Sequence, residues 1–376
     1  MRRFIPLTIL LTIAVFARPA YADPSSSPFE ILNEKLDTIQ QSLDNQVLPL
    51  VEETEPRIPI SNLPFTVDTP GSYYLTGDLT SSGDGIIITV DNVTIDLMGF
   101  TINGPDSGTT YGIYSEGPSN VEIRNGTIRN FGSHGIYQGG GNGYGHRVVS
   151  VRVISNGGDG IHMVAYAHLA KNCTVVGNNG NYGVLIGNGS IVTSNTVHGN
   201  RGRGISAGYS CAVRNNISYD NTGYGIYTGG GSTIIDNVSR ENGDRGISVD
   251  AACTLIGNTV HTNARSGIYT ERGCSIINNT VRNNNQSSIG GIPTEGGITT
   301  REQCLIKGNT STYNGYQNIY VAQSDSVIEE NVVLGSSKGI YFESGGNFYA
   351  NNRASGNTTD YANTAGNTDG GGNYSF

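Results

Sequence analysis

The chain has 376 residues, with 54 glycines, no tryptophan, only 14% charged residues and a formal net charge of −9. The negative charge argues against a general attraction to nucleic acid or anionic lipid. Low charge and abundant glycine also occur in disordered chains, but the regularly placed Ile and Val residues favour a packed interior.

The first segment, residues 1–22, predicts a secretory signal peptide. Arg2 and Arg3 form its basic start, residues 5–16 its apolar stretch, and Ala-Tyr-Ala at 20–22 its cleavage site. The apolar stretch is too short to span a bilayer, so no membrane insertion is expected. The sequence therefore predicts export to the periplasm or the extracellular space. Removal of the segment, which carries three arginines, changes the net charge from −9 to −12.

Residues 23–65 predict an amphipathic helix followed by a Pro-rich linker. Within 29–50, apolar residues recur every seven positions at Phe29, Leu36, Leu43 and Leu50. Two interpretations stay open. The helix is either a short coiled coil that makes a homo-oligomer, or a cap that packs on the open end of the region that follows.

The region after the linker repeats itself. Between residues 183 and 268 the period is 21 residues, marked by a Gly-aliphatic step, an Asn twelve residues later and a second Asn five residues after that. Looser copies extend from Gly85 to Gly339. A fixed period in this range predicts a solenoid, in which each unit buries its apolar face against its neighbours. The Gly residues of the strict copies are Gly183, Gly204, Gly225, Gly246 and Gly267.

The pattern inside each repeat indicates strands. Apolar and polar residues alternate in short runs broken by Gly and Asn, and no repeat contains an apolar stripe with a 3.6-residue period. A repeat of this length allows about three short strands, and equivalent positions would stack about 4.8 Å apart. Asn suits the bends because it tolerates left-handed backbone angles and can hydrogen-bond to its stacked copies.

With this repeat the chain resembles the right-handed parallel β-helix proteins of the pectin-lyase-like group. The resemblance implies an all-β solenoid of about twelve coils over residues 66–350, with 351–376 as a C-terminal cap or tail. Catalytic motifs of that group are missing. There is no Asp-Asp pair as in polygalacturonases and no Arg-x-Pro-x-x-Arg as in pectate lyases. The segment from Asp159 to His162 only approaches the Asp-Pro-His of alginate epimerases.

An outward stripe of Tyr, His and Arg residues is expected on the first strand of each repeat. If the aliphatic residue after each Gly points inward, its neighbours point outward. Tyr rings offer apolar faces to sugar C–H groups, and Arg binds carboxylates, so a linear polysaccharide fits this stripe. The alternative is that Tyr simply suits a half-buried sheet surface. The predicted substrate-binding residues are Tyr114, Tyr182, Tyr224, Tyr227, Arg245, Tyr269 and Tyr320.

The candidate catalytic residues are His134, Tyr137, Asp159 and His162 on adjacent coils, with Arg203 two coils further on. A polysaccharide lyase needs a base for the C5 proton, a donor for the leaving oxygen and a cation beside the uronate carboxylate. His162 or His134 would be the base, Tyr137 the acid and Arg203 the cation. Asp159 would orient a histidine or bind a metal. The alternative is an inert polar patch.

Cofactors are not evident from the sequence. No Cys or His residues have the spacing of a zinc site, and we assign no metal ligands. Pectate lyases of the resembling group carry a calcium-binding Asp set, which does not appear here, and calcium stays the one possible cofactor. The cysteines at 211, 253, 274 and 304 share one repeat position and should stack, as free buried thiols or with a Cys253–Cys274 bridge.

The predicted function is that of an exported, carbohydrate-active protein, which binds a linear polysaccharide along the stripe and cleaves it by β-elimination. The alternative is a non-catalytic envelope or extracellular protein, structural or adhesive, that uses the solenoid as a spacer and binding surface.

Overall fold

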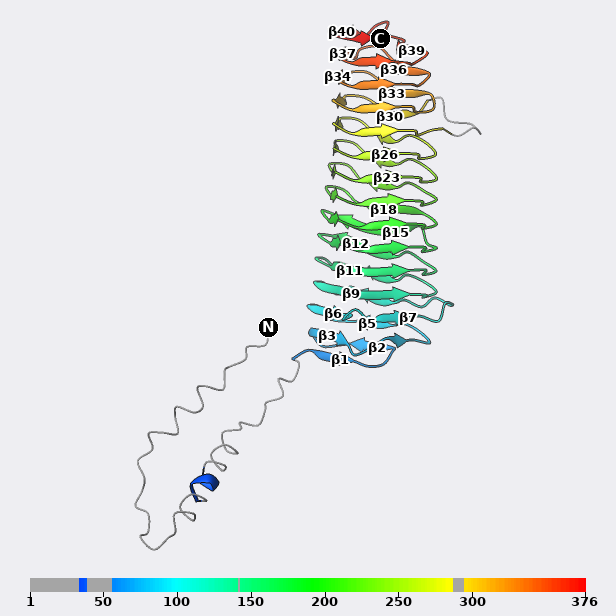
Figure 1. Ribbon diagram of the computed structural model, residues 1–376. Coiled ribbons are helices and arrows are strands. Elements are labelled where there is room, and N and C mark those ends of the chain that lie inside the picture. Colours follow the sequence, from blue (N-terminus) through cyan, green and yellow to red (C-terminus); the bar gives the residue numbers. More distant parts are fainter. Residues whose placement is uncertain (1–33, 39–55, 141–142, 287–293) are drawn as a thin grey trace. The chain divides into compact units, whose positions relative to one another are not determined.

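A computed structural model describes residues 34–38, 56–140, 143–286 and 294–376. The chain divides into two units, Met1–Pro56 and Arg57–Phe376. In the first unit, residues 34–38 are helical (Figure 1). The predicted signal peptide and the rest of the heptad segment 29–50 lie outside the described residues. Among the described residues, no helix is long and apolar enough to cross a bilayer.

The second unit is a parallel β-solenoid whose strands stack coil upon coil (Figure 1). One sheet contains 14 strands, one from each coil. These strands are β2 (Phe65–Val67), β5 (Ile86–Ile88), β8 (Ile113–Glu116), β10 (Ile136–Gly139), β12 (Ile161–Tyr166), β15 (Tyr182–Asn188), β18 (Arg203–Ala207), β21 (Ile226–Thr228), β24 (Ile247–Val249), β27 (Ile268–Thr270), β30 (Gly296–Thr300), β33 (Gln317–Val321), β36 (Lys338–Phe342) and β39 (Thr359–Ala362).

The other 27 strands form one continuous sheet, because β9 and β11 join its two columns of shorter strands. These strands are β1 (Ile58–Ile60), β3 (Gly71–Leu75), β4 (Leu79–Thr80), β6 (Val93–Asp96), β7 (Thr101–Asn103), β9 (Val121–Arg129), β11 (Arg147–Ile154), β13 (Leu169–Lys171), β14 (Thr174–Val176), β16 (Ile191–Thr193), β17 (Thr196–His198), β19 (Ala212–Arg214), β20 (Ile217–Tyr219), β22 (Thr233–Ile235), β23 (Val238–Arg240), β25 (Thr254–Ile256), β26 (Thr259–His261), β28 (Ser275–Ile277), β29 (Thr280–Arg282), β31 (Leu305–Lys307), β32 (Thr310–Thr312), β34 (Val327–Glu329), β35 (Val332–Leu334), β37 (Phe348–Ala350), β38 (Arg353–Ser355), β40 (Thr368–Asp369) and β41 (Tyr374–Ser375).

The all-β parallel solenoid confirms the predicted fold class, but the coil count differs. The 14-stranded sheet has two coils more than the expected twelve, and strands reach beyond residues 66–350 at both ends. In the first extra coil Phe65 pairs with Ile86, and in the last Tyr361 pairs with Ile340. These end coils have an aromatic residue where the repeat has Ile, so the Gly-aliphatic pattern does not mark them.

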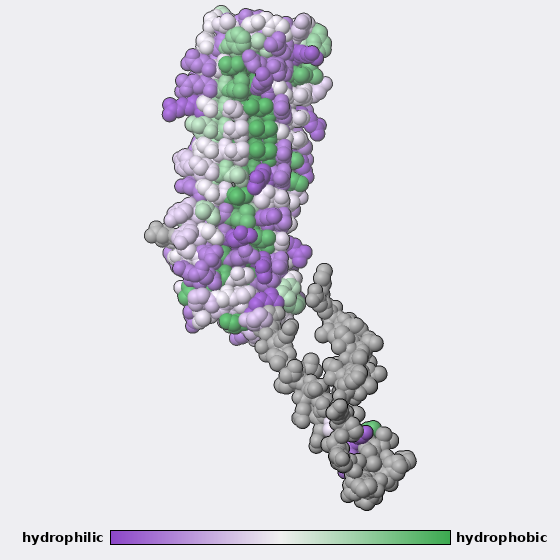
Figure 2. Space-filling view, turned by 90° about the vertical axis from the view of Figure 1, so that its left-hand side faces the viewer, coloured by the Kyte–Doolittle hydropathy of each residue, from purple (hydrophilic) through white to green (hydrophobic). Residues whose placement is uncertain are grey.

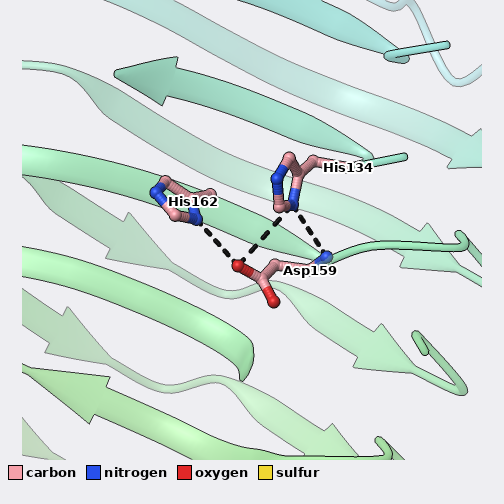
Figure 3. A group of neighbouring side chains, drawn as sticks. All are labelled: His134, Asp159 and His162. Carbon is pink, nitrogen blue, oxygen red and sulfur yellow. Dashed lines mark hydrogen bonds and ion pairs between the residues drawn. The ribbon is translucent and has the colours of Figure 1, made fainter. Parts of the chain in front are cut away.

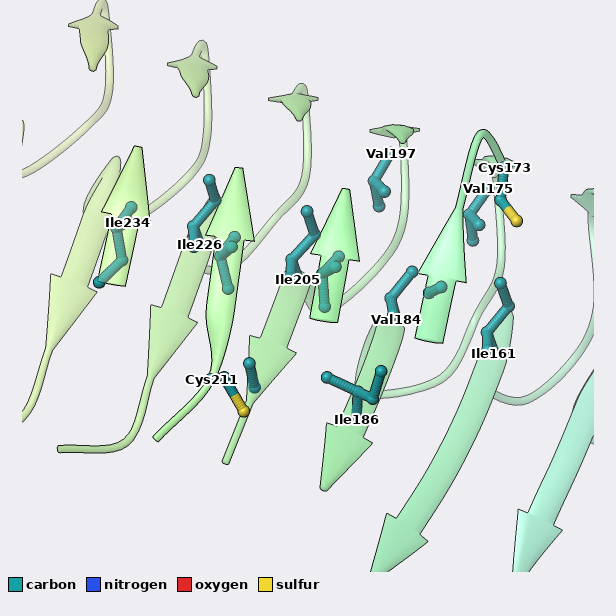
Figure 4. Close-up of a cluster of buried hydrophobic side chains, with 14 of the residues drawn as sticks. Ile161, Cys173, Val175, Val184, Ile186, Val197, Ile205, Cys211, Ile226 and Ile234 are labelled. Carbon is teal, nitrogen blue, oxygen red and sulfur yellow. The ribbon is translucent and has the colours of Figure 1, made fainter. Parts of the chain in front are cut away.

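The core lies between the sheets and is built from the aliphatic residue after each Gly. Ile205 stacks on Ile226 and Ile226 on Ile247, and all three are fully buried. Figure 4 shows such residues pointing inward toward Val175, Val197 and Ile234 from the other sheet. Each buried Ile contributes about 1.5–3 kcal/mol.

The Gly that precedes each inward Ile is required by close packing. A Cβ atom at Gly204 would lie 2.2 Å from Ser218 Oγ, and one at Gly225 would lie 2.1 Å from Ser239 Oγ. Ser218 Oγ in turn donates to the carbonyl of Gly225 at 2.7 Å. A Cβ atom at Gly204 would also lie 2.7 Å from the Gly225 carbonyl of the next coil, so there is no room for any side chain.

The two Asn positions of the repeat form buried hydrogen-bond ladders. In the first ladder, Asn258 Nδ2 donates to Asn279 Oδ1 at 2.9 Å and to the Ile234 carbonyl at 2.9 Å. Its Oδ1 accepts from the backbone N–H of Asn237 at 2.9 Å. The left-handed backbone angle belongs to the preceding residue, for example Asp236 with φ 55°. The ladder therefore satisfies the polar groups of a bend that would otherwise be buried without partners.

A third ladder runs through a different bend and uses several residue types. Cys253 N–H donates to Cys274 Sγ at 3.4 Å, and His146 N–H donates to His168 Nδ1 at 3.2 Å. All five cysteines are free and buried, and the four that were predicted to stack lie on this ladder. The ladder residues are His146, His168, Ser190, Cys211, Ser232, Cys253, Cys274, Cys304, Ser326, Asn347 and Asn367.

Stacking of equivalent positions also arranges the outer surface in stripes. One side of the second unit carries a narrow hydrophobic stripe along its length, flanked by hydrophilic side chains (Figure 2). Because one residue type recurs on successive coils, any ligand-binding feature of this surface is also extended along the axis.

The Asn ladder yields a first prediction. Asn258→Ala removes both Nδ2 donors and the Oδ1 acceptor inside the solenoid, and we expect it to lower the free energy of unfolding by about 3 kcal/mol. Urea denaturation followed by circular dichroism measures this loss. The exposed neighbour Asn278, with φ 54°, provides the control. Asn278→Gly keeps the left-handed angle and should change stability by less than about 0.5 kcal/mol. Equal losses in the two variants would contradict a stabilising ladder.

The third ladder yields a pH prediction. Burial, with a smaller contribution from His168, lowers the pKa of His146 from 6.5 to about 4. As pH falls below about 6.5, the unfolded chain takes up a proton at His146 that the folded chain does not, so stability is lost. Asn occupies the same ladder position at 347. His146→Asn should therefore lose about 2 kcal/mol less than the wild type between about pH 7.5 and 4.5 in urea titrations. Parallel pH profiles would refute this assignment.

Candidate functional site

The 14-stranded sheet carries two outward columns of polar and aromatic side chains, which we call together the outward stripe. In one column Tyr114, Tyr137 and His162 pair in register across β8, β10 and β12. In the other, the residues that precede each Gly stack in the same way, as Tyr182 does on Arg203. The stripe follows the long axis of the solenoid, as the sequence predicted.

An aromatic cluster occupies the coils of β8, β10 and β12. The rings of Tyr114 and Tyr137 are stacked, with centroids 5.5 Å apart and 9° between their planes. Tyr137 also lies 5.0 Å from the ring of His162 and 5.4 Å from that of His134. Tyr111 lies 5.7 Å from His134. The cluster therefore joins the candidate catalytic residues into one continuous ring surface.

Asp159 lies between the two histidines, and both rings turn toward its carboxylate (Figure 3). Its Oδ2 is 2.7 Å from His162 Nδ1 and 3.6 Å from His134 Nδ1. Its other oxygen accepts the backbone N–H of Tyr182 at 2.9 Å. The Asp159 side chain is 5% exposed, while those of His134 and His162 are 21% and 18% exposed. The histidines are therefore within reach of a ligand, and the carboxylate supports them from beneath.

The hydrogen bonds define which ring nitrogen carries the proton. A carboxylate only accepts, so His162 Nδ1–H donates to Asp159, and the lone pair of the neutral ring is on Nε2. His134 Nδ1 instead accepts the backbone N–H of Asp159 at 2.8 Å, so its proton is on Nε2. Burial lowers the pKa of His134, although the Asp159 charge opposes this effect. His162 is thus arranged as a base and His134 as a neutral hydrogen-bond donor.

Tyr137 is arranged as a proton donor. Burial, together with the charge of Glu116, raises its pKa, so the hydroxyl is protonated at neutral pH. Glu116 also accepts a hydrogen bond from the Tyr114 hydroxyl, which raises the pKa of Tyr114 to about 12. A Cβ atom at Gly139 would lie 2.4 Å from Tyr137 Cζ, so this Gly leaves room for the ring.

Two further glycines make space for the histidines and the carboxylate. A Cβ atom at Gly158 would lie 2.9 Å from His134 Nδ1, and one at Gly180 would lie 2.3 Å from Asp159 Oδ1. These glycines lie outside the Gly-aliphatic pattern of the repeat. They provide the room in which Asp159, already a candidate from the sequence, meets His134.

Arg203 does not join this cluster. Its guanidinium lies over the rings of Tyr224 and Tyr227, 4.8 Å and 4.4 Å from their centroids. The Tyr227 hydroxyl donates to Asp250 at 3.0 Å. No carboxylate pairs with Arg203 among the described residues. The Arg203 backbone is two coils from Asp159, and its charge points to the coil beyond, over the rings of Tyr224 and Tyr227.

Arg245 is engaged by a residue that sequence reasoning missed. Buried Glu295 accepts from Arg245 at 2.6 Å and from Arg265 at 2.5 Å. Burial opposes ionisation of Glu295, but its bonds to Arg245 outweigh that effect and lower the pKa. Arg245 also lies over the Tyr269 ring, 3.5 Å from its centroid. Glu295 comes from a segment without the repeat pattern, which is why its pairing was not foreseen. The charge of Arg245 is thus already compensated.

One predicted substrate-binding residue is not accessible. Tyr320 is only 5% exposed, and the Tyr341 ring stacks on it at 5.6 Å. The expectation that Tyr320 faces a ligand was wrong, because the adjacent coil repeats the aromatic residue and covers it. Tyr114, Tyr182, Tyr224, Tyr227 and Tyr269 are half-buried and keep part of each ring at the surface.

The structure brings three residues with metal-ligand chemistry together. His134 precedes Asp159 by 25 residues in the sequence. That separation is one coil, so the two side chains meet in space. Together with His162 they offer three ligand atoms within 4.8 Å of one another.

The fold and the outward stripe define a parallel β-solenoid with a solvent-facing aromatic and imidazole surface. A family model described as "Right handed beta helix region" matches residues 111–256, 170–299 and 228–376, which together cover more than half of the chain. The protein therefore belongs to the right-handed β-helix family. Comparison with curated proteins finds no match.

Several solved structures are similar to this chain. A mutant of the periplasmic alginate epimerase AlgG is 15% identical with a TM-score of 0.53, covering 82% of this chain and 78% of the other. The A-module of mannuronan C-5 epimerase AlgE6 from Azotobacter vinelandii is 16% identical with a TM-score of 0.47, covering 82% and 91%. The GH87 α-1,3-glucanase catalytic unit from Streptomyces thermodiastaticus is 14% identical with a TM-score of 0.36, covering 81% and 62%. At 15% identity the similarity to AlgG shows the fold alone.

The hydrogen bonds predict two different histidine tautomers. With both imidazole rings neutral, His162 should carry its proton on Nδ1 and His134 on Nε2. Two-bond ¹⁵N–¹H correlation spectra of protein labelled with ¹⁵N-histidine distinguish these two tautomers. Asp159→Asn should abolish the preference at His162, because an amide can donate as well as accept. His261 on β26 of the other sheet, whose ring hydrogen-bonds to Thr262, serves as a control that this variant should leave unchanged. The same tautomer at both residues in the wild type would contradict the geometry.

Proposed function

We propose that this protein binds a linear, uronate-containing polysaccharide along the outward stripe and cleaves it by β-elimination at the cluster around His162. The observation that carries the proposal is the 2.7 Å bond between His162 Nδ1 and buried Asp159. This bond leaves Nε2 as a base next to the aromatic surface. The proposal includes export, in line with the signal peptide predicted over residues 1–22.

Binding would use the rings and the open cation of the stripe. Exposed faces of Tyr rings pack against sugar C–H groups, and a guanidinium binds a carboxylate through two hydrogen bonds. Arg203 lies two coils from Asp159, so it would hold a sugar next to the reacting one. A periplasmic alginate epimerase has a similar fold, which is compatible with a polysaccharide as the ligand of this protein.

The elimination would need only residues of this cluster. His162 Nε2 takes the proton from C5 of the uronate, and the C5–H electron pair forms the C4–C5 double bond. The bond from C4 to the glycosidic oxygen breaks, and the Tyr137 hydroxyl protonates the leaving oxygen. The 5.0 Å between the His162 and Tyr137 rings lets both reach one sugar. Donation from His134 Nε2–H to the carboxylate would stabilise the charge that develops there.

The test is incubation of the purified protein with polyuronates and neutral glycans, with and without calcium, while unsaturated ends are followed by ultraviolet absorbance. We expect His162→Ala and Tyr137→Phe each to lower the rate by about 100-fold or more, with glycan affinity changed only a few-fold. His198→Ala and Tyr219→Phe remove the same groups from β17 and β20 of the other sheet and should leave the rate unchanged.

The outcomes separate the proposed enzyme from its alternatives. Polysaccharide binding without a product from any substrate would refute the elimination and leave a recognition module. In that case truncation of Tyr224 or Tyr227 should weaken binding in small steps. Neither binding nor product would favour a structural or adhesive spacer.

A further inference from the structure

The carboxylate of Asp159 is buried without a fixed positive partner. Within the described ranges it pairs with His134 and His162 but with no Lys or Arg. His134 accepts a hydrogen bond at Nδ1 and so brings no charge to the carboxylate. By contrast, the equally buried carboxylate of Glu295 has two arginines. A buried carboxylate is costly unless it is paired or coordinates a cation.

The distances around this carboxylate fit a small transition-metal ion. Tetrahedral zinc with bonds of about 2.0–2.2 Å to imidazole nitrogen and carboxylate oxygen places its ligand atoms roughly 3.3 Å apart. Asp159 Oδ2 lies 2.7 Å from His162 Nδ1 and 3.6 Å from His134 Nδ1, one below and one above that separation. The three ligand atoms all lie within 4.8 Å of one another. Rotation of the two rings, with release of the Asp159 N–H from His134 Nδ1, would bring them to three corners of a tetrahedron.

The surroundings hold the three side chains in place. The backbone N–H of Tyr182 binds the second oxygen of Asp159 at 2.9 Å. The rings of His134 and His162 lie 4.9 Å apart, and both pack against Tyr137. Such contacts orient metal ligands and are a large part of metal affinity. Both histidine side chains keep an exposed edge, so an ion can enter from the outward stripe.

We propose that His134, Asp159 and His162 form a binding site for a divalent transition-metal ion of the zinc type, with a fourth position open to water or an oxygen ligand. Two imidazoles and one carboxylate suit zinc, cobalt or nickel, whereas calcium takes six to eight oxygen ligands. The site does not depend on the proposed lyase function. Metal on His162 Nδ1 moves the ring proton to Nε2, so metal binding and proton abstraction by His162 exclude each other.

The test measures metal binding directly. Chelator-treated protein, with any polyhistidine tag removed, is titrated with ZnCl₂ by calorimetry and with CoCl₂ by visible absorption. We expect about one ion per chain, with the strong absorption bands of tetrahedral cobalt. His134→Ala, Asp159→Asn and His162→Ala should each weaken binding by at least about tenfold. His261→Ala removes a histidine from β26 and is the matched control, which should bind as the wild type does.

Circular dichroism of each variant confirms that the solenoid is folded. Absence of saturable zinc binding in the folded wild type would overturn the proposal. So would binding that Asp159→Asn and His162→Ala leave unchanged, because the ion would then bind elsewhere. No glycan is present, so a failed glycan assay does not affect this result, and a failed titration does not affect the lyase proposal.

Discussion

The structure depends on one constraint, which is that polar groups inside the solenoid must find partners on the next coil. Asn258, Asn279 and their copies meet it with hydrogen bonds of about 3 Å from one coil to the next. The bonds hold equivalent residues in register, and Gly204 and Gly225 let the backbones approach closely. Inward Ile residues then pack in continuous columns. Disturbing one coil therefore affects its two neighbours more than distant coils.

The same register assembles the candidate site. His134 and Asp159 stand on consecutive coils, and Asp159 lies just before β12, which carries His162. Stacking thus turns residues far apart in the chain into neighbours with hydrogen-bond contacts. Gly158 and Gly180 remove side chains that would occupy this space. These contacts hold the carboxylate at the centre of the site, while both histidine rings keep an exposed edge.

The central carboxylate determines what the cluster can do. With a proton on His162 Nδ1, Asp159 orients a base whose lone pair faces the ligand side. With a metal ion in the place of that proton, the same ring loses its basic nitrogen. Arg203 is compatible with either state, since its guanidinium lies over Tyr224 and Tyr227 and not beside Asp159 or His162. The lyase proposal thus describes this site without a metal ion, and the metal proposal describes the same site with an ion bound.

The sequence alone determined the parallel solenoid, the inward Ile columns, the stacked cysteines and the membership of His134, Tyr137, Asp159 and His162 in one face. These follow from a repeat whose period equals one coil. The ends of the solenoid escaped detection because Phe65 and Tyr361 replace the repeated Ile. Only the tertiary structure decided that Tyr320 is covered, that Arg245 is engaged by Glu295 and that Arg203 lies over Tyr224 and Tyr227. These outcomes depend on side-chain contacts between coils, and a repeat pattern gives the position of a residue but not the partner that its side chain reaches.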